Sequence, residues 1–257
     1  MSTTNNAAGR LLDILIRGRE LPTNVAMYEN WAHLLSVPKN DKALLLQRVG
    51  RVMELPSQIK DSLINIPEIR HEAYLRWAPK VEEAFSIINL DIHWSNFIQR
   101  IDDSVLFSLE MCEDTIQRYF PEKPAKNNDL NELLSAIDDL LSDVREDETI
   151  NERLKAFILV HLLTIKHAIE EYEICGLEPI ERAIESTIGG AVMHSEARPR
   201  MDSIAPLKRF WDIFTKALLV LQFVHSGFEV SADIHPILPL WPKEETDLPD
   251  DPLLNVG

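Results

Sequence analysis

The amino-acid sequence predicts an all-α protein: a multi-helix bundle of long and short helices, followed by a proline-rich, mostly irregular C-terminal tail. Three observations lead to this fold class. Apolar residues recur at steps of three and four over several long stretches, which is the period of one helix face. The chain of 257 residues has only eight glycines, few for a protein with many tight turns. Prolines mark the starts of several predicted helices and are dense after Phe228.

The N-terminal part is predicted to contain short helices followed by one long helix. Residues 1–9 are polar and are expected to be frayed. The short helices are predicted at residues 11–17, 23–37, 41–55, 56–65, 67–78 and 79–88. Asn89 is then expected to cap the longest helix, in which eight apolar residues from Trp94 to Tyr119 follow each other at near-heptad spacing. Such spacing predicts left-handed packing against long partner helices.

A linker is predicted at residues 121–128, which hold two prolines and two lysines. It separates an N-terminal helical subdomain, residues 1–120, from a C-terminal helical subdomain, residues 129–227. The second subdomain is expected to begin with an amphipathic helix at residues 130–144 and to end with one that starts at Ser203 and stops at Gly227. Residues 228–257 form the extended acidic tail, whose apolar stretch 234–241 is expected to lie across the helical body.

The C-terminal subdomain is organised around residues 152–192. In this stretch an apolar helix is followed by a break and then by a second helix that pairs with the first. One face of the first helix is formed by Leu154, Ile158, His161, Ile165, Ile169 and Tyr172. Gly176 is suited to the left-handed backbone conformation that ends a helix, and Pro179 has the dihedral angle of a new first turn. Because the first helix is apolar over so much of its circumference, it is predicted to be packed on several sides.

Part of this region has a recognisable pattern, in which an acidic turn leads into a leucine-rich helix that a tyrosine and a glycine close. The residues that carry it are Leu154, Leu162, Ile165, Ala168, Ile169, Tyr172, Gly176, Ala183 and Gly189. With them, residues 133–190 resemble a helical segment common in uncharacterised bacterial accessory proteins. The resemblance implies no activity, but it implies an accessory protein of the kind encoded beside defence or mobile-element genes.

Cysteine use and hydropathy predict a soluble, cytoplasmic protein. Cys112 and Cys175 form no CxxC pair and lie far apart, so neither a zinc site nor a disulfide framework is indicated. The longest strongly apolar run, residues 217–224, is too short to span a bilayer, and no membrane partner is expected. Glycine patterns that cradle phosphates are absent from the sequence, and no cofactor is expected.

The charge is acidic and unevenly distributed. The formal net charge is −16, and residues 102–151 hold fourteen Asp or Glu against four Lys or Arg. Because a polyanion would be repelled by this region, nucleic acid is not expected as a partner. Four basic residues at positions 39–51 leave open a DNA-binding group of three helices as an alternative. Basic residues on a helix surface are, however, commonly part of a face exposed to solvent.

Three residues of the central helix are candidates for catalysis. His161 lies within the most apolar run of the chain, where a buried neutral imidazole with one hydrogen bond is the usual structural role. His167 and Glu171 are four residues apart, so they share a helix face and are able to form an ion pair or hold a metal. On the solvated rim of a helix, such a pair has no chemical role.

A metal pair is suggested by the ExxH spacing of Glu68 and His71. A ferritin-like di-metal centre needs two such motifs and two further acids, and the sequence offers one motif. Pro67 is expected to place Glu68 in the first turn of a helix, where the helix dipole favours a carboxylate without any metal. The structural interpretation of this pair is therefore preferred.

These observations favour a non-enzymatic helical protein-protein interaction or adaptor subunit, which binds another protein or a second copy of itself. Membership in a bacterial defence-type or regulatory complex is one expectation that follows from this interpretation. One alternative is a toxin-like or hydrolytic effector that uses the candidate histidines of the central helix. Another is an acidic DNA-mimic inhibitor, in which the carboxylates of residues 102–148 imitate phosphates. An enzymatic role is thus less favoured than a binding role.

Overall fold

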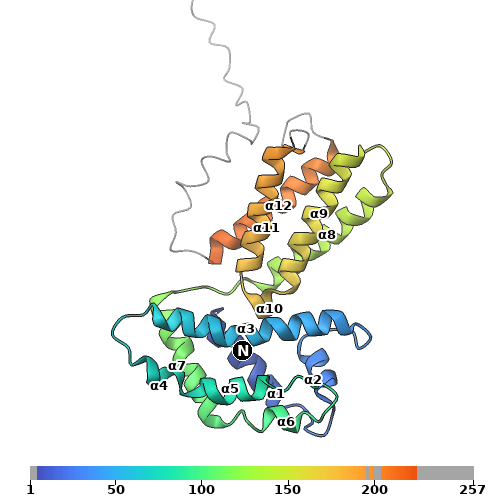
Figure 1. Cartoon of the computed structure of the whole chain (residues 1–257). Helices are drawn as coiled ribbons and strands as arrows, with labels where there is room; N and C mark the ends of the chain where they lie inside the picture. The colour runs from blue at the N-terminus through green and yellow to red at the C-terminus, as the bar shows by residue number, and fades with distance from the viewer. Residues whose placement is uncertain (1–4, 195–196, 199–203, 225–257) are drawn as a thin grey trace, which may run out of the picture.

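A computed structural model describes residues 5–194, 197–198 and 204–224, and over these residues the chain is folded into helices (Figure 1). The prediction of an all-α protein is confirmed, since no strand occurs in the described ranges and Ala26 and His93 form only an isolated antiparallel bridge. Within the same ranges, no helix has the length and apolar character needed to cross a membrane. The predicted acidic tail, including its apolar stretch 234–241, lies outside the described residues.

The first group of helices surrounds one cluster of buried hydrophobic side chains. Its members are α1 (Ala7–Arg19), α2 (Met27–Leu34), α3 (Lys42–Ile64), α4 (His71–Tyr74), the 3-10 helix Leu75–Trp77, α5 (Ala78–Phe85), α6 (Ser95–Ile98) and α7 (Asp103–Tyr119). Stacked and edge-to-face aromatic rings fill the centre of this cluster, and the rings of Trp31 and Trp94 lie 5.1 Å apart. The indole of Trp94 donates a hydrogen bond to the carbonyl of Gly18 at 2.8 Å.

The start of the chain is more ordered than the sequence suggests. Residues 1–9 were expected to be frayed, but Asn5 and Asn6 are buried and α1 begins at Ala7. The side chain of Asn6 accepts a hydrogen bond from the backbone of Gly9 at 3.1 Å, and it donates one to the carbonyl of Glu113 at 3.2 Å. Asn6 therefore caps α1 and joins it to α7, which explains why this polar side chain is buried.

Proline does not end the third helix. The predicted separate helices at residues 41–55 and 56–65 are wrong, because α3 continues through Pro56. Proline removes one backbone hydrogen bond from a helix, but Leu55 and Ile59 on either side are fully buried. Packing of this apolar face thus outweighs the lost bond. The predicted helix at residues 67–78 is also wrong, since only α4 and the adjoining 3-10 turn form there.

The predicted long helix from Asn89 to Tyr119 is two helices, α6 and α7. Asp102 separates them, and its carboxylate accepts a hydrogen bond from the backbone of Val105 at 3.1 Å, which starts α7. Trp94 and Ile101 before the break belong to the same buried cluster as Val105 after it. The near-heptad spacing of the apolar residues therefore continues across the break. Periodicity therefore predicted the buried face and missed the break.

The second group is a bundle of four long helices with one short helix. It consists of α8 (Asn127–Glu146), α9 (Glu152–Glu170), α10 (Tyr172–Cys175), α11 (Glu178–Met193) and α12 (Ala205–Val224). Helix α9 packs against α8, α11 and α12, and the six residues predicted for its apolar face are all buried. The predicted break at Gly176 is present, with a backbone φ of 70° that suits glycine.

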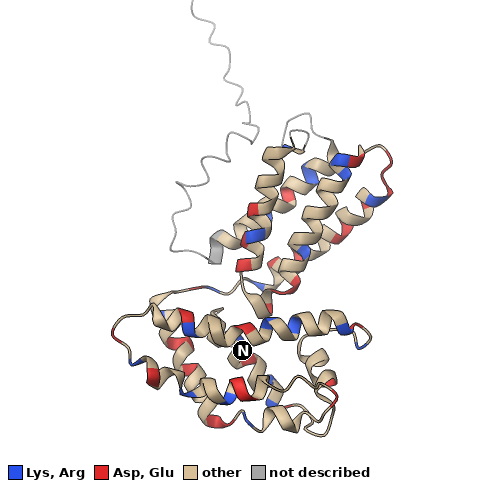
Figure 2. Ribbon diagram, in the orientation of Figure 1, with Lys and Arg blue, Asp and Glu red and all other residues tan. Residues whose placement is uncertain are grey.

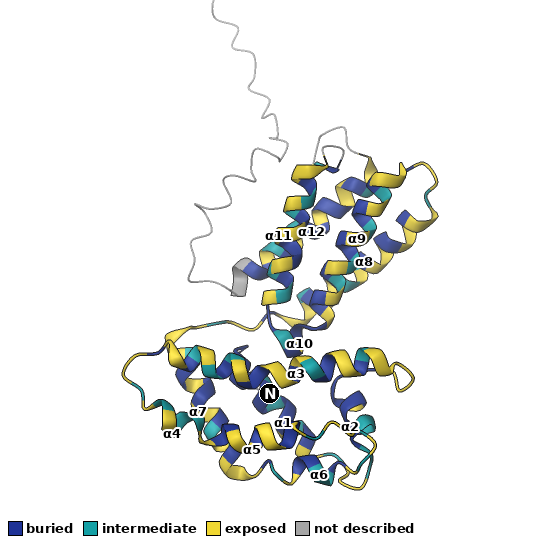
Figure 3. Cartoon of the chain, in the orientation of Figure 1, coloured by how far each residue is buried: buried dark blue, intermediate teal, exposed yellow. Residues whose placement is uncertain are grey.

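Burial divides the chain into the two groups of helices (Figure 3). The first cluster of buried hydrophobic residues runs from Ala7 to Ile116, and the second begins at Ala125. The short helix α10 is an exception, because Ile174 belongs to the first cluster and Cys175 packs against it, whereas Tyr172 and Leu177 belong to the second. Folding of the two groups as independent subdomains stays a prediction.

Candidate functional site at the junction of the helix groups

The two groups meet where α10 and Gly176 contact α1. Arg10 of α1 lies under this turn, where its Nε donates a hydrogen bond to the carbonyl of Ile174 at 2.9 Å. Its other nitrogens donate to the carbonyl of Asn5 and, at 3.3 Å, to the side chain of Gln58. Burial lowers the pKa of the Arg10 guanidinium, and these oxygen acceptors compensate for its lost hydration. A Cβ atom on Gly176 would collide with the same guanidinium.

Two further hydrogen bonds lie at the junction beside Arg10, one within the second group and one between the groups. The phenol oxygen of Tyr172 accepts a hydrogen bond from the backbone of Ala125, at 2.6 Å, and so connects α10 to the linker that precedes α8. Burial raises the pKa of the Tyr172 phenol, which keeps it protonated. Gln47 of α3 donates to the carboxylate of Glu171 at 2.8 Å. The junction is therefore built from specific polar contacts as well as from apolar packing.

A cleft of about 740 Å³ lies at this junction, between α3 and the helices α9 and α11. Its volume is within the range usual for ligand pockets, which are often found between domains. Side chains of both charges line it, among them Arg51, Glu54, His167, Glu171 and Arg182. Figure 2 shows that basic and acidic residues are interspersed over the helices of both groups.

Glu171 is a buried acidic residue of this larger cleft. Its exposed fraction is 8%, and one carboxylate oxygen lies 4.0 Å from the Nε of Arg51. The Sγ atom of Cys175 lies 3.9 Å from the same carboxylate oxygen, and burial together with the charge of Glu171 raises the pKa of Cys175 to about 11. Since the thiolate is the reactive form of cysteine, Cys175 is a poor nucleophile at neutral pH.

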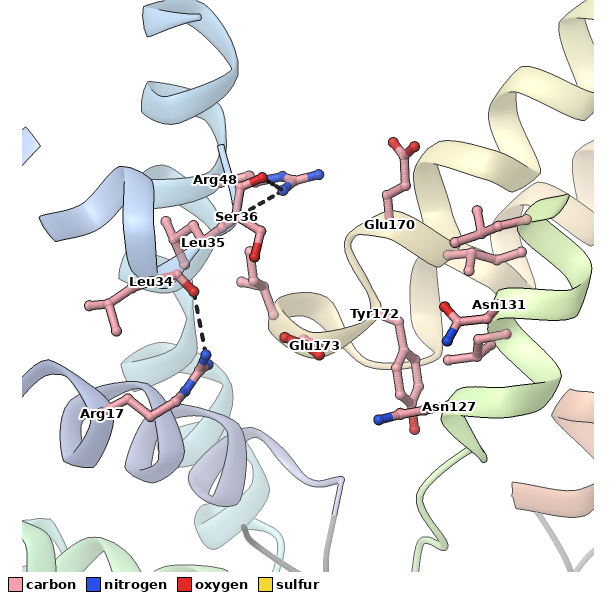
Figure 4. A pocket seen from close by; sticks show the side chains of 14 residues that line it. Arg17, Leu34, Leu35, Ser36, Arg48, Asn127, Asn131, Glu170, Tyr172 and Glu173 are labelled. Carbon is pink, nitrogen blue, oxygen red and sulfur yellow. Dashed lines mark hydrogen bonds between the residues drawn. The ribbon is translucent and has the colours of Figure 1, made fainter. Parts of the chain in front are cut away.

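A smaller cleft of about 280 Å³, drawn in Figure 4, is lined by both groups as well. Arg48 and Glu170 line both clefts. On its N-terminal side, Arg48 donates a hydrogen bond to the carbonyl of Leu35 at 2.7 Å, and Arg17 donates to that of Leu34 at 3.5 Å. Both arginines thus bind carbonyls at the C-terminal end of α2, where the helix dipole favours positive charge. Their charge is explained without a ligand.

His161 lies away from the clefts, inside the bundle. Its Nδ1 atom is 3.2 Å from the hydroxyl of Thr187, and its ring lies 4.4 Å from that of Phe157. Burial lowers the pKa of His161, and the nearby His194 lowers it further. Six residues, or about 9 Å of helix, separate His161 from His167, whose side chain is exposed. The structure therefore does not bring the two candidate histidines together.

The predicted pair of His167 and Glu171 is wrong in its partner. The Nδ1 atom of His167 lies 3.4 Å from the carboxylate of Glu170, on the solvent side of α9. Glu171 is the residue at which α9 ends and the chain bends into α10, so its side chain points toward Gln47 of α3. The backbone of Glu171 still donates to the carbonyl of His167 at 3.1 Å, so the helical spacing holds and the two side chains differ in the partners they meet.

The predicted position of Glu68 is also wrong, because it lies before α4 in a left-handed backbone conformation with a φ of 69°. His71 starts that helix, and its Nε2 atom is 3.0 Å from the carbonyl of Leu63. This contact gives His71 a structural role. In the described part of the chain, no three or more His, Cys, Asp or Glu side chains are grouped as metal ligands.

Some carboxylates of the acidic region are paired with basic residues of neighbouring helices. On α8, Asp138 lies 2.5 Å from the Nζ of Lys166, and Asp143 pairs with Arg209. These pairs reduce the negative charge that α8 presents. A surface that imitates nucleic-acid phosphates would need such charges to stay uncompensated.

Sequence reasoning did not identify Arg10, Gln47 or Tyr172 as junction residues. A basic residue on the apolar face of a helix, as Arg10 is, was the available signal, but its partner is 164 residues away. In comparisons with known proteins, no family model, no curated protein and no solved structure matches the chain. Its function is therefore argued from the geometry of the junction.

Proposed function

We propose that the chain is a non-enzymatic helical interaction protein, an adaptor subunit whose partner protein binds in the larger junction cleft. The observation that carries this proposal is the cleft itself, about 740 Å³ in volume, with walls from both helix groups. A partner that contacts α3 and α11 together would also fix the relative position of the groups. Binding and the arrangement of the junction would then be coupled.

The surface beside the cleft supports a protein partner. Leu46 and Met53 of α3 are 60% and 42% exposed, and Gly50 lies between them. They precede the lining residues Gln47 and Glu54 by one position, so they lie about 100° around α3 from the lining face. An exposed apolar strip next to charged and amide side chains is the composition of a protein interface, with its apolar core and polar rim.

The chemical groups at the junction support binding more than hydrolysis. The Cys175 thiol has a raised pKa, and Glu171 is engaged by Gln47 and Arg51. His161 is enclosed in the bundle instead of facing the cleft. A hydrolytic site needs a base that activates its nucleophile, whereas the carboxylate of Glu171 beside Cys175 raises the pKa of the thiol and so favours its protonated form.

Reversing one cleft charge tests the proposal. Arg182 and Arg209 are both exposed arginines that pair with an acid on the protein surface, but only Arg182 lines the cleft. We expect Arg182→Glu to reduce the recovery of the partner by at least about tenfold, because a reversed charge that meets a like charge at an interface costs more than about 1.4 kcal/mol. Arg209→Glu is the matched control and should bind like the wild type. Quantitative mass spectrometry of proteins that co-purify from the native host is the measurement.

Equal recovery of the same partner by all three proteins would contradict the cleft as the binding surface. A second copy of the chain is tested separately by light scattering after size-exclusion chromatography. Membership in a bacterial defence-type or regulatory complex is part of the proposal and is tested by the identity of the partner. The free cysteines Cys112 and Cys175 support a reducing compartment such as the cytoplasm.

A further inference from the structure

A groove of about 360 Å³ lies between the start of α8 and the end of α12. Its apolar wall is formed by Leu133 of α8 with Leu219 and Val220 of α12, and its polar lining consists of Asp129, Glu132 and Lys216. Leu219 is 56% exposed, so the described helices leave part of the apolar wall uncovered. On such a surface, a further apolar segment gains free energy by leaving water.

The face of α12 that leads to this groove carries positive charge. Four exposed residues of this face follow each other at helical steps of four, four and three: Lys208, Asp212, Lys216 and Leu219. Neither of the two lysines forms an ion pair with another described residue. Because the formal net charge of the chain is −16, a helix face with more basic than acidic residues is suited to attract an acidic segment.

The sequence beyond α12 has a composition that matches this surface. Residues 234–241 include five large apolar side chains and no Asp, Glu, Lys or Arg, and residues 242–257 then hold five Asp or Glu against one Lys. Val224, the last residue of α12, lies four residues past Val220, or about 6 Å along the helix. The ten residues from Val224 to Ile234 span up to about 33 Å, so the apolar stretch 234–241 is long enough in tether to reach the groove.

We propose that residues 234–241 bind in this groove of their own chain and run antiparallel to α12. From Leu219 back to Lys208 the helix measures about 17 Å. A proline-rich extended chain rises about 3.1 Å per residue, so the six residues from Leu238 to Glu244 cover about 19 Å. With Leu238 on Leu219, the first acids of the tail therefore reach the lysines of α12. The stretch that passes the two acids of α8 carries no acid of its own.

A segment of the same chain has an advantage over a free partner at this groove. A tether of about ten residues holds the apolar stretch at an effective concentration of about millimolar, so a contact with a dissociation constant below this value is mostly formed. The groove shares no lining residue with the larger cleft. Binding of the tail is therefore independent of the partner protein proposed for that cleft.

Fluorine NMR of the full chain labelled with fluorotryptophan tests the proposal. The chain has five tryptophans, and Trp241→Phe identifies the signal of Trp241. In the wild type we expect this signal to be shifted and broadened relative to that of a water-exposed tryptophan. Leu219→Glu should return it to the position and width of the exposed form. Val160→Glu is the matched control and should leave the signal unchanged, since Val160 of α9 is 57% exposed and does not line the groove.

A second pair of variants tests the contribution of charge. Lys208→Glu should move the Trp241 signal part of the way to the exposed position, because it repels the acids of the tail. Lys42→Glu makes the same charge change at an exposed position of α3 and should have no effect on the signal. The signal of Trp211, which is buried in α12, monitors folding of the bundle in each variant.

The proposal is overturned if the Trp241 signal of the wild type already has the exposed position, or if Leu219→Glu leaves that signal unchanged. A signal that depends on protein concentration would overturn it as well, because the groove would then hold the tail of a second copy. Should Leu219→Glu unfold the bundle, Leu238→Asp decides, since it changes only the tail and should release Trp241.

Discussion

At the contact between Gly176 and Arg10, the structure of the junction depends on the identity of a single residue, Gly176. Gly176 has a positive φ, and its missing side chain leaves room for the Arg10 guanidinium. The sequence predicted a helix break at this glycine, but it gave no sign of the arginine beneath it. Two residues so far apart in the chain come together only through the tertiary fold.

Gly176→Ala should lower the free energy of unfolding by more than about 1 kcal/mol, because the native backbone is incompatible with an alanine side chain. Gly189→Ala serves as the control, since it lies in α11 with open space around it. Alanine there should raise the free energy of unfolding by about 0.5–1 kcal/mol through helix propensity. Urea unfolding curves measure both. Equal effects of the two substitutions would show that Gly176 is an ordinary helix-end glycine.

His161 should make stability depend on pH. Its pKa is lower in the folded protein than the ordinary value near 6.5, so the unfolded chain binds the proton more readily. The contribution of His161 to stability is therefore complete above about pH 6.5 and is lost as the pH falls below that value toward the folded pKa.

His161→Gln removes the titrating group and keeps a side chain able to contact Thr187. We expect the stability of this variant to fall less between pH 7 and pH 5 than that of the wild type. Thermal unfolding followed by circular dichroism is the measurement. His167→Gln, at an exposed position, should behave like the wild type, and an equal change in both variants would contradict the role given to burial of His161.

Cys175 reports on the charge of Glu171. The Sγ atom lies 3.9 Å from that carboxylate, and burial and Glu171 raise the pKa of the thiol to about 11. Glu171→Gln should lower this pKa and accelerate alkylation of Cys175 by iodoacetamide at pH 8, as followed by mass spectrometry. The buried thiol Cys112, with a pKa also near 11, is the internal control. An unchanged rate at Cys175 would place Glu171 elsewhere in solution.

At the scale of helices, the apolar pattern predicted faces better than boundaries. Every residue predicted for the face of α9 is buried, and the face from Trp94 to Ile116 is buried although it belongs to two helices. Periodicity depends on which side meets the core, and that side continues across a break such as the one before Asp102. Pro56 shows the opposite case, in which a local signal for a boundary was overruled by packing of Leu55 and Ile59.

The start of α9 is set by a side-chain cap that can be tested alone. Asn151 accepts a hydrogen bond from the backbone of Leu154 at 2.9 Å. Asn151→Ala should lower the free energy of unfolding by about 1 kcal/mol, the usual cost of losing such a cap. Asn131→Ala, at an exposed position inside α8, is the control and should not destabilise, since alanine is the better helix former. Similar losses for both would argue against a capping role.

At the scale of the whole molecule, the sequence identified individual residues of the clefts but did not predict that they lie together. His167, Glu171 and the break at Gly176 were each identified, but the larger cleft also needs α3, which lies more than a hundred residues earlier. Whether α3 faces α11 depends on how α10 inserts between the groups, and that is decided by Arg10, Gln47 and Tyr172. Local periodicity contains no information on such contacts.

The proposal that the larger cleft binds a partner protein is tested most directly by site-specific photo-crosslinking in the native host. A benzophenone amino acid at Ser57, exposed at the edge of the cleft, is compared with one at Ile88, which is 85% exposed and does not line it. We predict a crosslink to one partner protein from Ser57 and none from Ile88, and loss of that crosslink when Arg182→Glu is added. Equal crosslinking from both positions, or none from Ser57, would contradict the proposed function.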